Sequence, residues 1–294
     1  MGGIGRMYGS IAVEHLGADA LFYIMDHERY LRNRNKTYRV NGKDIPFRME
    51  ETPQPCDLII VAVKYTGLEA ALETMAPFVG EDTLILSVMN GISTEEIIGA
   101  RFGKGRVIHA VAQGMDAVYL GTELTFTKSG TLCIGITEKT PEMQEKLERV
   151  AAFFAKAGIA YAIEADIIYR MWCKWMLNVG INQVTMVYNV GYGKALEEGS
   201  AEYMTMVGAM REVILLANRE NIPLTEKDLK DYLAILSTLD PEAMPSMAQD
   251  RLSRRPSEVE LFAGTVLRLG QKHGIPVPAN GFLYRRVREI EEAY

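Results

Sequence analysis

Residues 1–10 read MGGIGRMYGS, a glycine-rich stretch whose spacing decides how the first half of the chain is interpreted. Gly2 and Gly5 match the second and third glycines of the G-x-G-x-x-G fingerprint, in which a helix N-terminus holds a pyrophosphate. Asp26 follows Gly5 by 21 residues, close to the usual spacing of an acid that ends the next strand and binds a ribose 2′-hydroxyl. The stretch therefore predicts a Rossmann-like domain that binds a dinucleotide, with a generic glycine-rich helix start as the plainer interpretation.

The strand that should precede the glycine loop is missing from this sequence, because the first glycine of the fingerprint would fall before residue 1. That strand is normally the central one of the sheet, and without it both neighbouring strands would keep unpaired backbone groups. We therefore expect either that the natural coding region begins several residues upstream or that another segment replaces the strand.

Two features around Asp26 favour different nicotinamide cofactors. An acid at this position favours NAD, because it repels the 2′-phosphate of NADP. Basic residues follow at once and could hold that phosphate by charge-assisted hydrogen bonds. They are His27, Arg29, Arg32 and Arg34. A solvated loop of mixed charge is the interpretation without a ligand.

Extended and helical patterns alternate through the rest of the first half. Four short apolar runs have the length of strands that are buried on both faces of a parallel sheet. They cover residues 21–25, 57–63, 83–89 and 107–111. Residues 119–137 alternate with a period near two around Ser129-Gly130, which predicts a hairpin that extends the sheet. A helix from Thr140 to Gly158 and a strand at 159–163 complete this α/β pattern.

From about Ala165 onward the patterns are helical, with only short breaks. We therefore expect an α/β fold: a Rossmann-like, doubly wound sheet that lacks its first strand, followed by an all-helical domain. Residues 1–160 would form the dinucleotide-binding domain and residues 161–294 the helical substrate and catalytic domain. The active cleft is expected between the two halves.

The composition excludes several classes of protein. The 294 residues carry a net charge of −6, so the chain lacks the basic surface that nucleic acids and anionic membranes attract. No apolar run is long enough to span a bilayer, and three widely spaced cysteines without a CxxC pair fit a reducing cytoplasm. Four scattered histidines lack ligand spacing, so we expect no metal. A cytoplasmic protein with a small-molecule substrate, and with no nucleic-acid or membrane partner, is predicted.

The segment 171–182 reads MWCKWMLNVGIN and places Lys174, Asn178 and Asn182 at i, i+4 and i+8. These positions share one face of a helix. Apolar residues cover most of the remaining circumference, which predicts that the helix is buried. A buried ammonium indicates either a structural lysine paired with a carboxylate or a group that takes part in chemistry. Periodicity alone leaves both interpretations open.

With this helix, the sequence resembles the ketopantoate reductase family over nearly the whole chain. Several separated segments agree in order and in spacing. They are the glycine loop GGIGRMYG, VAVK ending at Lys64, MNG at Asn90, the Lys174/Asn178/Asn182 helix, SMAQD from Ser246, Glu258 twelve residues later, and HGIPVPAN at 273–280.

The resemblance implies that a 2-oxo acid, 2-dehydropantoate (ketopantoate), is reduced to pantoate by NADPH in pantothenate biosynthesis. Lys174 would be the general acid and Glu258 its catalytic partner. Hydrogen bonds to the carboxylate and hydroxyl groups of the substrate would come from Asn178, Asn182 and Ser246. The residues beside the cofactor would be Gly2, Gly5, Asp26, Lys64 and Asn90. The implied cofactor is NADP, with NAD as the alternative that Asp26 allows, and a homodimer is compatible with the sequence.

Two positions depart from the family's usual pattern. Gln183 follows Asn182 where a proline is common, and Gly191-Tyr192-Gly193 replaces a more polar loop. A related NAD(P)-dependent reductase of another 2-oxo acid is therefore one alternative, because modest changes in a pocket alter substrate discrimination by a few kcal/mol. A dinucleotide-binding protein without catalysis is another, because half of the phosphate loop is missing.

Overall fold

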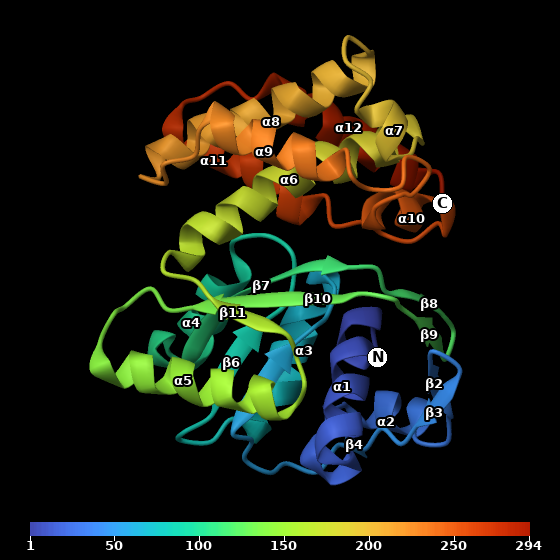
Figure 1. Ribbon diagram of the computed structural model, residues 1–294, viewed down its shortest axis with the longest axis vertical. Coiled ribbons are helices and arrows are strands. Elements are labelled where there is room, and N and C mark those ends of the chain that lie inside the picture. The colour runs from blue at the N-terminus through green and yellow to red at the C-terminus, as the bar shows by residue number, and fades with distance from the viewer. The chain divides into compact units, whose positions relative to one another are not determined.

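The structure is a computed structural model that describes residues 1–294, and the chain folds into two compact units. The first unit comprises Met1–Met89 and Ser93–Ile167, and the second comprises Asn90–Ile92 and Ile168–Tyr294. The short segment Asn90–Ile92 therefore belongs with the second unit, although the residues on both sides of it belong to the first. Figure 1 shows the elements of both units.

A five-stranded sheet forms the centre of the first unit, in the order β11-β10-β7-β6-β5. β5, β6 and β7 are parallel, β10 is antiparallel to β7, and β11 is parallel to β10. Their bounds are β5 Leu58–Val61, β6 Leu84–Ser87, β7 Val107–Met115, β10 Ser129–Gly135 and β11 Tyr161–Ile163. The strands expected in the runs 57–63, 83–89, 107–111 and 159–163 are thus present.

Helices cover both faces of this sheet. α1 (Gly3–Leu16) and α5 (Pro141–Lys156) share one apolar core with Leu84 and Leu86 of β6. α3 (Leu68–Met75) and α4 (Thr94–Phe102) share a second core with Ile85. Successive strand residues point to opposite faces, so the two pairs of helices lie on opposite sides of the sheet. This arrangement confirms the doubly wound, Rossmann-like domain.

Two neighbours of the expected central strand are present without that strand. β1 (Tyr23–Ile24) pairs in parallel with β4 (Met49–Glu50), and the two form a sheet of their own. β5 is the last strand of the five-stranded sheet. In a doubly wound fold, the strand that leads into the glycine loop lies between these two strands. No strand pairs with β1 and β5 at that place among residues 1–294.

The hairpin predicted around Ser129-Gly130 is wrong, because β10 pairs with β7 instead. Gly130 has a φ of 68°, and a Cβ atom there would lie 2.1 Å from the carbonyl oxygen of Gln113. The glycine therefore permits a close approach between two strands and does not make a turn. The hairpin of this region is formed by β8 (Val118–Leu120) and β9 (Glu123–Thr125).

This hairpin belongs to a four-stranded sheet that the sequence patterns did not predict. Its order is β3-β2-β9-β8, with β2 at Tyr38–Val40 and β3 at Lys43–Ile45. β2 pairs in parallel with β9 and thereby joins segments more than eighty residues apart. The sheet also lies against the first turn of α1, because a Cβ atom on Gly3 would lie 3.0 Å from the ring of Tyr119.

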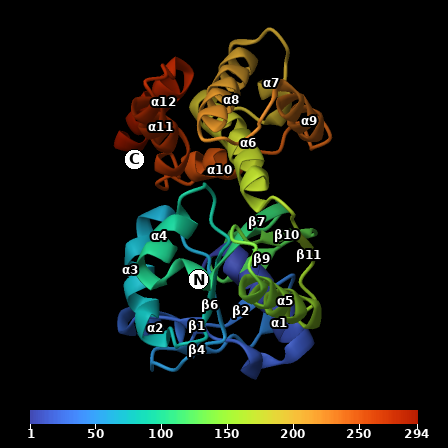
Figure 2. The same cartoon turned by 90° about the vertical axis from the view of Figure 1, so that its left-hand side faces the viewer.

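The second unit is helical throughout, as predicted. α6 (Ile167–Tyr188) lies in its core, since Trp175, Met176 and Val179 are at most 1% exposed. α8 (Ala201–Arg219) packs closely on α6, because a Cβ atom on Gly180 would lie 2.6 Å from Met210 Cγ. The other helices are α7 Tyr192–Ala195, α9 Glu226–Leu236, α10 Ser246–Leu252, α11 Thr265–His273 and α12 Pro278–Glu292. α8, α11 and α12 pack on one another (Figure 2).

None of the helices combines the length and the hydrophobicity that a membrane-spanning segment needs.

Candidate active site

The polar stripe predicted on 171–182 is present on α6. Lys174 is half-buried, whereas Asn178 and Asn182 are only 8% and 5% exposed. The next stripe on the same helix is apolar and includes Trp175 and Val179, both at most 1% exposed. The helix therefore buries most of its circumference and presents these three polar side chains along one line.

Asn90 joins the two groups that the resemblance identifies as the acid and its partner. Lys174 Nζ donates a hydrogen bond to Asn90 Oδ1 at 3.0 Å, and Asn90 Nδ2 donates to Glu258 Oε2 at 2.8 Å. Asn178 Nδ2 lies 3.5 Å from the same Oδ1, at the outer limit of a hydrogen bond. Because all four residues belong to the second unit, the cluster is formed within one compact body.

The backbone around Asn90 explains how its side chain reaches this place. Asn90 follows β6, and Gly91 next to it has a φ of 99°, a value that glycine adopts at little cost. A Cβ atom on Gly91 would lie 3.2 Å from Leu261 Cδ2, so the glycine also lets the backbone lie against that side chain. Any other residue at 91 would disturb both the turn and this contact.

Glu258 lies just before a wide helical turn, the π-helical η5 (Glu260–Gly264), which leads into α11. Leu261 N donates to the carbonyl oxygen of Glu258 at 2.9 Å. Trp175 Nε1 of α6 donates to the carbonyl oxygen of Leu261 at 2.8 Å. The turn that follows Glu258 is therefore tied directly to the helix that carries Lys174.

This cluster combines an ammonium, a neutral amide and a carboxylate in one hydrogen-bonded chain. The amide oxygen faces the ammonium of Lys174, and the amide nitrogen faces the carboxylate of Glu258. An ammonium held in this way can donate a proton to an oxygen that gains negative charge. The arrangement is thus suited to proton transfer and to the binding of an anionic group.

The other two predicted substrate residues are placed differently. The Asn182 side chain makes no hydrogen bond to another residue of the chain, although it is 5% exposed. Ser246 is the first residue of α10 and is exposed, and no hydrogen bond joins it to Asn90. Arg251 of the same helix donates to the carbonyl oxygen of Val187 at 2.9 Å and so fixes α10 to the end of α6.

The glycine-rich loop at 191–193 is explained by a close approach of the segment before Ser246. A Cβ atom on Gly191 would lie 2.6 Å from the carbonyl oxygen of Pro241, and one on Gly193 would lie 2.8 Å from Pro241 Cβ. Gly193 N also donates to that carbonyl oxygen at 2.8 Å. The two glycines therefore position the chain that leads into α10, a role that the composition of the loop did not indicate.

In the first unit, the start of α1 has the features that bind a phosphate. Gly2 is the N-cap residue and supplies no side-chain hydrogen bond, so the N–H groups of the first turn are left to other partners. Arg6, one turn into the helix, is 0% exposed, and its Nε and Nη2 atoms have no hydrogen-bond partner in the protein. Such buried donors usually have a partner. The residues at this helix start therefore fit the pyrophosphate of a dinucleotide.

The structure also gives the glycines of this loop separate roles. A Cβ atom on Gly5 would make only ordinary contacts, 3.7 Å from Ala62 Cβ and 3.8 Å from the ring of Tyr23. A Cβ atom on Gly9 would lie 2.0 Å from Tyr23 Oη. Gly9, which the fingerprint does not include, is therefore the glycine that lets α1 pack on β1.

Asp26 and Lys64 lie at strand ends, as predicted. Asp26 follows β1 and is the N-cap of α2 (His27–Asn33), where its Oδ1 accepts from Arg29 N at 2.8 Å. Its Oδ2 lies 3.3 Å from Arg29 Nε, so the two charges form an ion pair. Lys64 is exposed just after β5, and its carbonyl oxygen accepts from Gly67 N at 2.8 Å.

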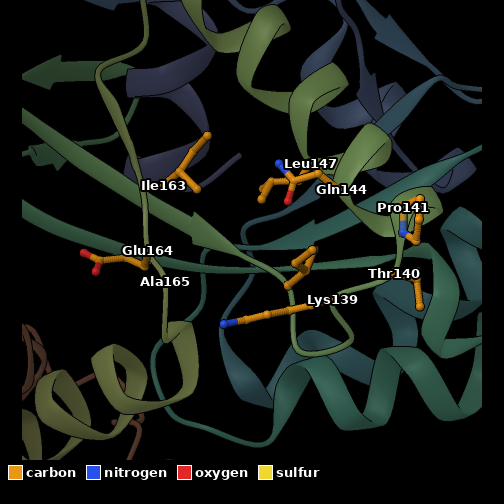
Figure 3. A pocket seen from close by; sticks show the side chains of 9 residues that line it. Lys139, Thr140, Pro141, Gln144, Leu147, Ile163, Glu164 and Ala165 are labelled. Carbon is orange, nitrogen blue, oxygen red and sulfur yellow. The ribbon is translucent and has the colours of Figure 1, made fainter.

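A surface hollow of about 470 Å³ lies elsewhere on the first unit, at the N-terminus of α5 (Figure 3). Apolar side chains, among them Ile136, Leu147 and Ile163, line it together with the charged residues Lys139 and Glu164. None of the predicted site residues lines it. The hollow is therefore separate from the residues described above.

Comparison with known proteins agrees with this geometry. The family model for the ketopantoate reductase PanE/ApbA matches residues 1–139, and the model for its C-terminal part matches residues 166–291. The chain belongs to the ketopantoate reductase family. The resemblance seen in the sequence is thereby confirmed, and the chain is an NAD(P)-dependent oxidoreductase of this family.

Individual relatives of this family member are distant in sequence and close in fold. A 2-dehydropantoate 2-reductase of Aquifex aeolicus is 27% identical over 269 residues, which are 88% of this chain and 86% of the relative. The crystal structure of a ketopantoate reductase from Ralstonia eutropha JMP134 is 25% identical and has a TM-score of 0.85. The match covers 99% of this chain and 96% of that one. The structure of a D-mandelate dehydrogenase with NADH and anilino(oxo)acetate is 22% identical, has a TM-score of 0.87, and the match covers 99% of this chain and 96% of that one.

Proposed function

We propose that this member of the family reduces 2-dehydropantoate to pantoate with NADPH, and that Lys174 is the general acid. The observation that carries the proposal is the bond between Lys174 Nζ and Asn90 Oδ1, with Glu258 bound to the other end of the same amide. Three residues that are distant in sequence are brought together at one point, and each has the chemistry that an oxo-acid reductase needs. The reaction belongs to pantothenate biosynthesis.

Lys174 acts on the carbonyl oxygen of the substrate in this proposal. A bound nicotinamide cofactor supplies the hydride that adds to the carbonyl carbon. Negative charge then develops on the carbonyl oxygen, and the Lys174 ammonium stabilises it and donates a proton. The bond to Asn90 orients the ammonium before the substrate binds.

Glu258 and Asn90 support this proton transfer. The carboxylate of Glu258 accepts from Asn90 Nδ2, and this fixes the amide with its oxygen toward Lys174. Glu258 also supplies a negative charge near the ammonium, on the other side of the Asn90 amide. The position of Asn90 beside the cofactor, expected from the strand end, stays a prediction.

Asn178, Asn182 and Ser246 are proposed to bind the carboxylate and the hydroxyl groups of the substrate. The Asn182 amide is suited to this role because it is nearly buried and makes no bond within the chain. A carboxylate or hydroxyl group of the substrate would supply this amide with hydrogen-bond partners. Asn178 shares the face of Lys174 and is already within 3.5 Å of Asn90.

The dinucleotide is proposed to bind the first unit through Gly2, Gly5, Asp26 and Lys64, with Arg6 as an additional donor. NADPH is favoured over NADH because Arg29 pairs with Asp26 and so reduces its repulsion of a 2′-phosphate. Four cations act together at the start of α1. These are Arg6, Arg29, Lys36 and Arg32. Their combined positive potential suits a ligand with three phosphates.

In this proposal, residues 1–160 serve dinucleotide binding, apart from Asn90–Ile92, which belong with residues 161–294 in substrate binding and catalysis. A homodimer is compatible with this division. Absorbance at the NADPH band tests the activity directly: purified protein should oxidise NADPH when 2-dehydropantoate is added. Binding of NADPH that quenches Trp172 and Trp175 fluorescence without any oxidation would support a dinucleotide-binding protein without catalysis.

A reductase of another 2-oxo acid is the second candidate, favoured by the likeness in fold to D-mandelate dehydrogenase and by the unusual Gln183 and Gly191–Gly193. A panel that includes 2-dehydropantoate, pyruvate, 2-oxoisovalerate and phenylglyoxylate separates the candidates. The proposal expects the highest kcat/KM with 2-dehydropantoate. A tenfold or greater preference for phenylglyoxylate, on the scale that pocket changes produce, would favour the second candidate.

A further inference from the structure

Gln183 is 0% exposed and uses both ends of its amide. Its Oε1 accepts from the backbone N–H of Ala263 at 3.1 Å. Its Nε2 donates to Val179 O at 2.7 Å and to Asn280 Oδ1 at 3.3 Å. One side chain of α6 therefore binds two segments that follow it by 80 and 97 residues.

Ala263 lies in η5, the wide turn that follows Glu258. Gly264 N donates to Val259 O at 2.9 Å across the turn, and Leu261 N donates to Glu258 O. A turn of this width is uncommon and has less regular hydrogen bonding than an α-helix. The bond from Ala263 N–H to Gln183 therefore ties the turn to a side chain of another helix.

Gln183 is the second of two contacts between α6 and this turn. Trp175 Nε1 donates to Leu261 O at 2.8 Å, and Trp175 lies eight residues before Gln183. Trp175 follows Lys174 directly, and Gln183 follows Asn182 directly. The stripe that carries the proposed catalytic and substrate residues thus has a neighbouring stripe that holds the turn after Glu258 at two points.

The orientation of the Gln183 amide is fixed by its bond to Asn280 and by the bond of Asn280 to Glu212. Asn280 Nδ2 donates to Glu212 Oε2 at 2.7 Å, which leaves Asn280 Oδ1 to accept from Gln183 Nε2. Glu212 also accepts from the N–H groups of Ala279 and Asn280 at the start of α12, at 2.7 and 2.9 Å. With Nε2 directed to Asn280, Oε1 can only face Ala263 N–H. This chain of buried bonds, once satisfied, resists rearrangement.

We propose that Gln183 is a positioning residue that holds Glu258 at its working distance from Lys174 and Asn90, through η5. The expected effect on kcat/KM rests on the proposed function of Lys174 and Glu258. The expected effect on the turn rests only on the hydrogen bonds described above. The Gln183 amide thus connects α6 directly to the turn that follows Glu258.

The test compares Gln183→Leu and Gln183→Glu with Thr185→Val in the full chain. Thr185 is the matched control, because it is also 0% exposed on α6 and its hydroxyl bonds only to carbonyl oxygens of the same helix, Ile181 at 2.7 Å and Asn182 at 3.2 Å. The rate of amide hydrogen exchange in the segment 258–265 measures how firmly the turn is held and needs no enzymatic activity. The pH profile of kcat/KM with NADPH and 2-dehydropantoate measures the effect on catalysis.

We expect Gln183→Leu to raise exchange at 258–265 by about tenfold or more. We also expect kcat/KM to fall by about 10- to 100-fold, mainly through kcat, as for a misplaced catalytic group. Thr185→Val should leave both values within about twofold of the natural protein. For Gln183→Glu we compare kcat/KM with that of the natural protein at the same pH. This ratio should rise as the pH falls. A protonated carboxyl can still donate to Asn280 and accept from Ala263, whereas a carboxylate cannot donate.

Unchanged exchange at 258–265 in Gln183→Leu would overturn the inference, whatever reaction the enzyme performs. So would raised exchange with kcat/KM equal to that of Thr185→Val. If the natural protein reduced no 2-oxo acid, the proposed function would fail, and the exchange comparison would still show whether Gln183 holds the turn.

Discussion

Lys174 Nζ lies 3.0 Å from Asn90 Oδ1, and this bond joins α6 to a residue 84 positions earlier in the chain. Because Asn90 Nδ2 is bound to Glu258, the oxygen of the amide has only one direction to face. The ammonium and the carboxylate are thus held on opposite ends of a neutral group. This arrangement keeps the two charged groups near one another.

Replacement of Asn90 by Asp should damage this arrangement without a change in size. The carboxylate can still accept from Lys174, but it would face the carboxylate of Glu258 where a donor stood before. We expect kcat/KM to fall by about 100-fold, within the range that acid and base groups contribute. Asn221→Asp, at an exposed position just after α8, is the control and should stay near the natural value. Equal kinetics for the two variants would contradict a role for Asn90 in the site.

Stability should depend on pH through Glu95, which is buried in α4 and bonded to Thr94 Oγ1. Burial raises the pKa of Glu95 to about 7, against about 4.5 in the unfolded chain. The native state therefore keeps a proton that the unfolded state has lost. Stability from this group is complete below pH 4.5 and falls as the pH rises to 7, by on the order of 3 kcal/mol.

Urea unfolding of Glu95→Gln and of the natural protein between pH 4.5 and 8 measures this effect. Glu96→Gln, an exposed neighbour on α4, is the control. Burial lowers the pKa of His109 to about 4, so this group makes the native state more stable as the pH rises toward 6.5. Because both proteins contain His109, the relevant quantity is the difference in the free energy of unfolding between the variant and the natural protein. That difference should grow in favour of Glu95→Gln as the pH rises. A constant difference would show that Glu95 is ionised in the native state throughout.

Gly9 should tolerate alanine only when Tyr23 is shortened. A Cβ atom at 9 would lie 2.0 Å from Tyr23 Oη, which also donates to Gly5 O at 2.9 Å. We expect Gly9→Ala to destabilise the protein by about 1–3 kcal/mol. In the Tyr23→Phe background the same change should cost less, because the oxygen at 2.0 Å is gone and only the ring carbon Cζ stays close, at 3.0 Å. Additive free energies of unfolding in this cycle would show that the two residues do not clash.

Arg29 should contribute to the choice of cofactor. Its guanidinium pairs with Asp26, and its positive charge acts at the start of α1. We expect Arg29→Ala to lower the ratio of kcat/KM for NADPH to that for NADH by about tenfold, the scale of one charge-assisted hydrogen bond. Arg39→Ala, which breaks an exposed pair with Asp44, is the control. A ratio that is unchanged in both variants would assign the phosphate preference to other residues.

Local sequence patterns predicted those helices and strands whose own residues are enough to specify them. The short apolar runs became β5, β6 and β7, and Thr140 caps α5 by accepting from Met143 N at 3.2 Å. The hairpin around Ser129-Gly130 failed because a glycine inside a strand and a glycine in a turn look alike in sequence. The sequence does carry a turn signal at Asn41-Gly42, whose φ angles of 49° and 77° form the turn between β2 and β3.

The site was predictable to the extent that one helix carries it. Periodicity placed Lys174, Asn178 and Asn182 on one face of α6, and their burial follows that pattern. The bonds of Asn90 to Lys174 and to Glu258 span 84 and 168 residues, so no local pattern could give them. The resemblance to the family pointed to Asn90, Lys174 and Glu258 one by one. Only the three-dimensional structure shows that Asn90 bonds to both of the other two.

The central claim is that Lys174 donates the proton in the reduction of 2-dehydropantoate. Its most direct test is NADPH absorbance with the natural protein, Lys174→Ala and Lys194→Ala, where Lys194 is an exposed lysine of the same unit that pairs with Glu197. The account predicts a loss of at least about 100-fold in kcat for Lys174→Ala and none beyond about twofold for Lys194→Ala. Near-normal turnover in Lys174→Ala would contradict it.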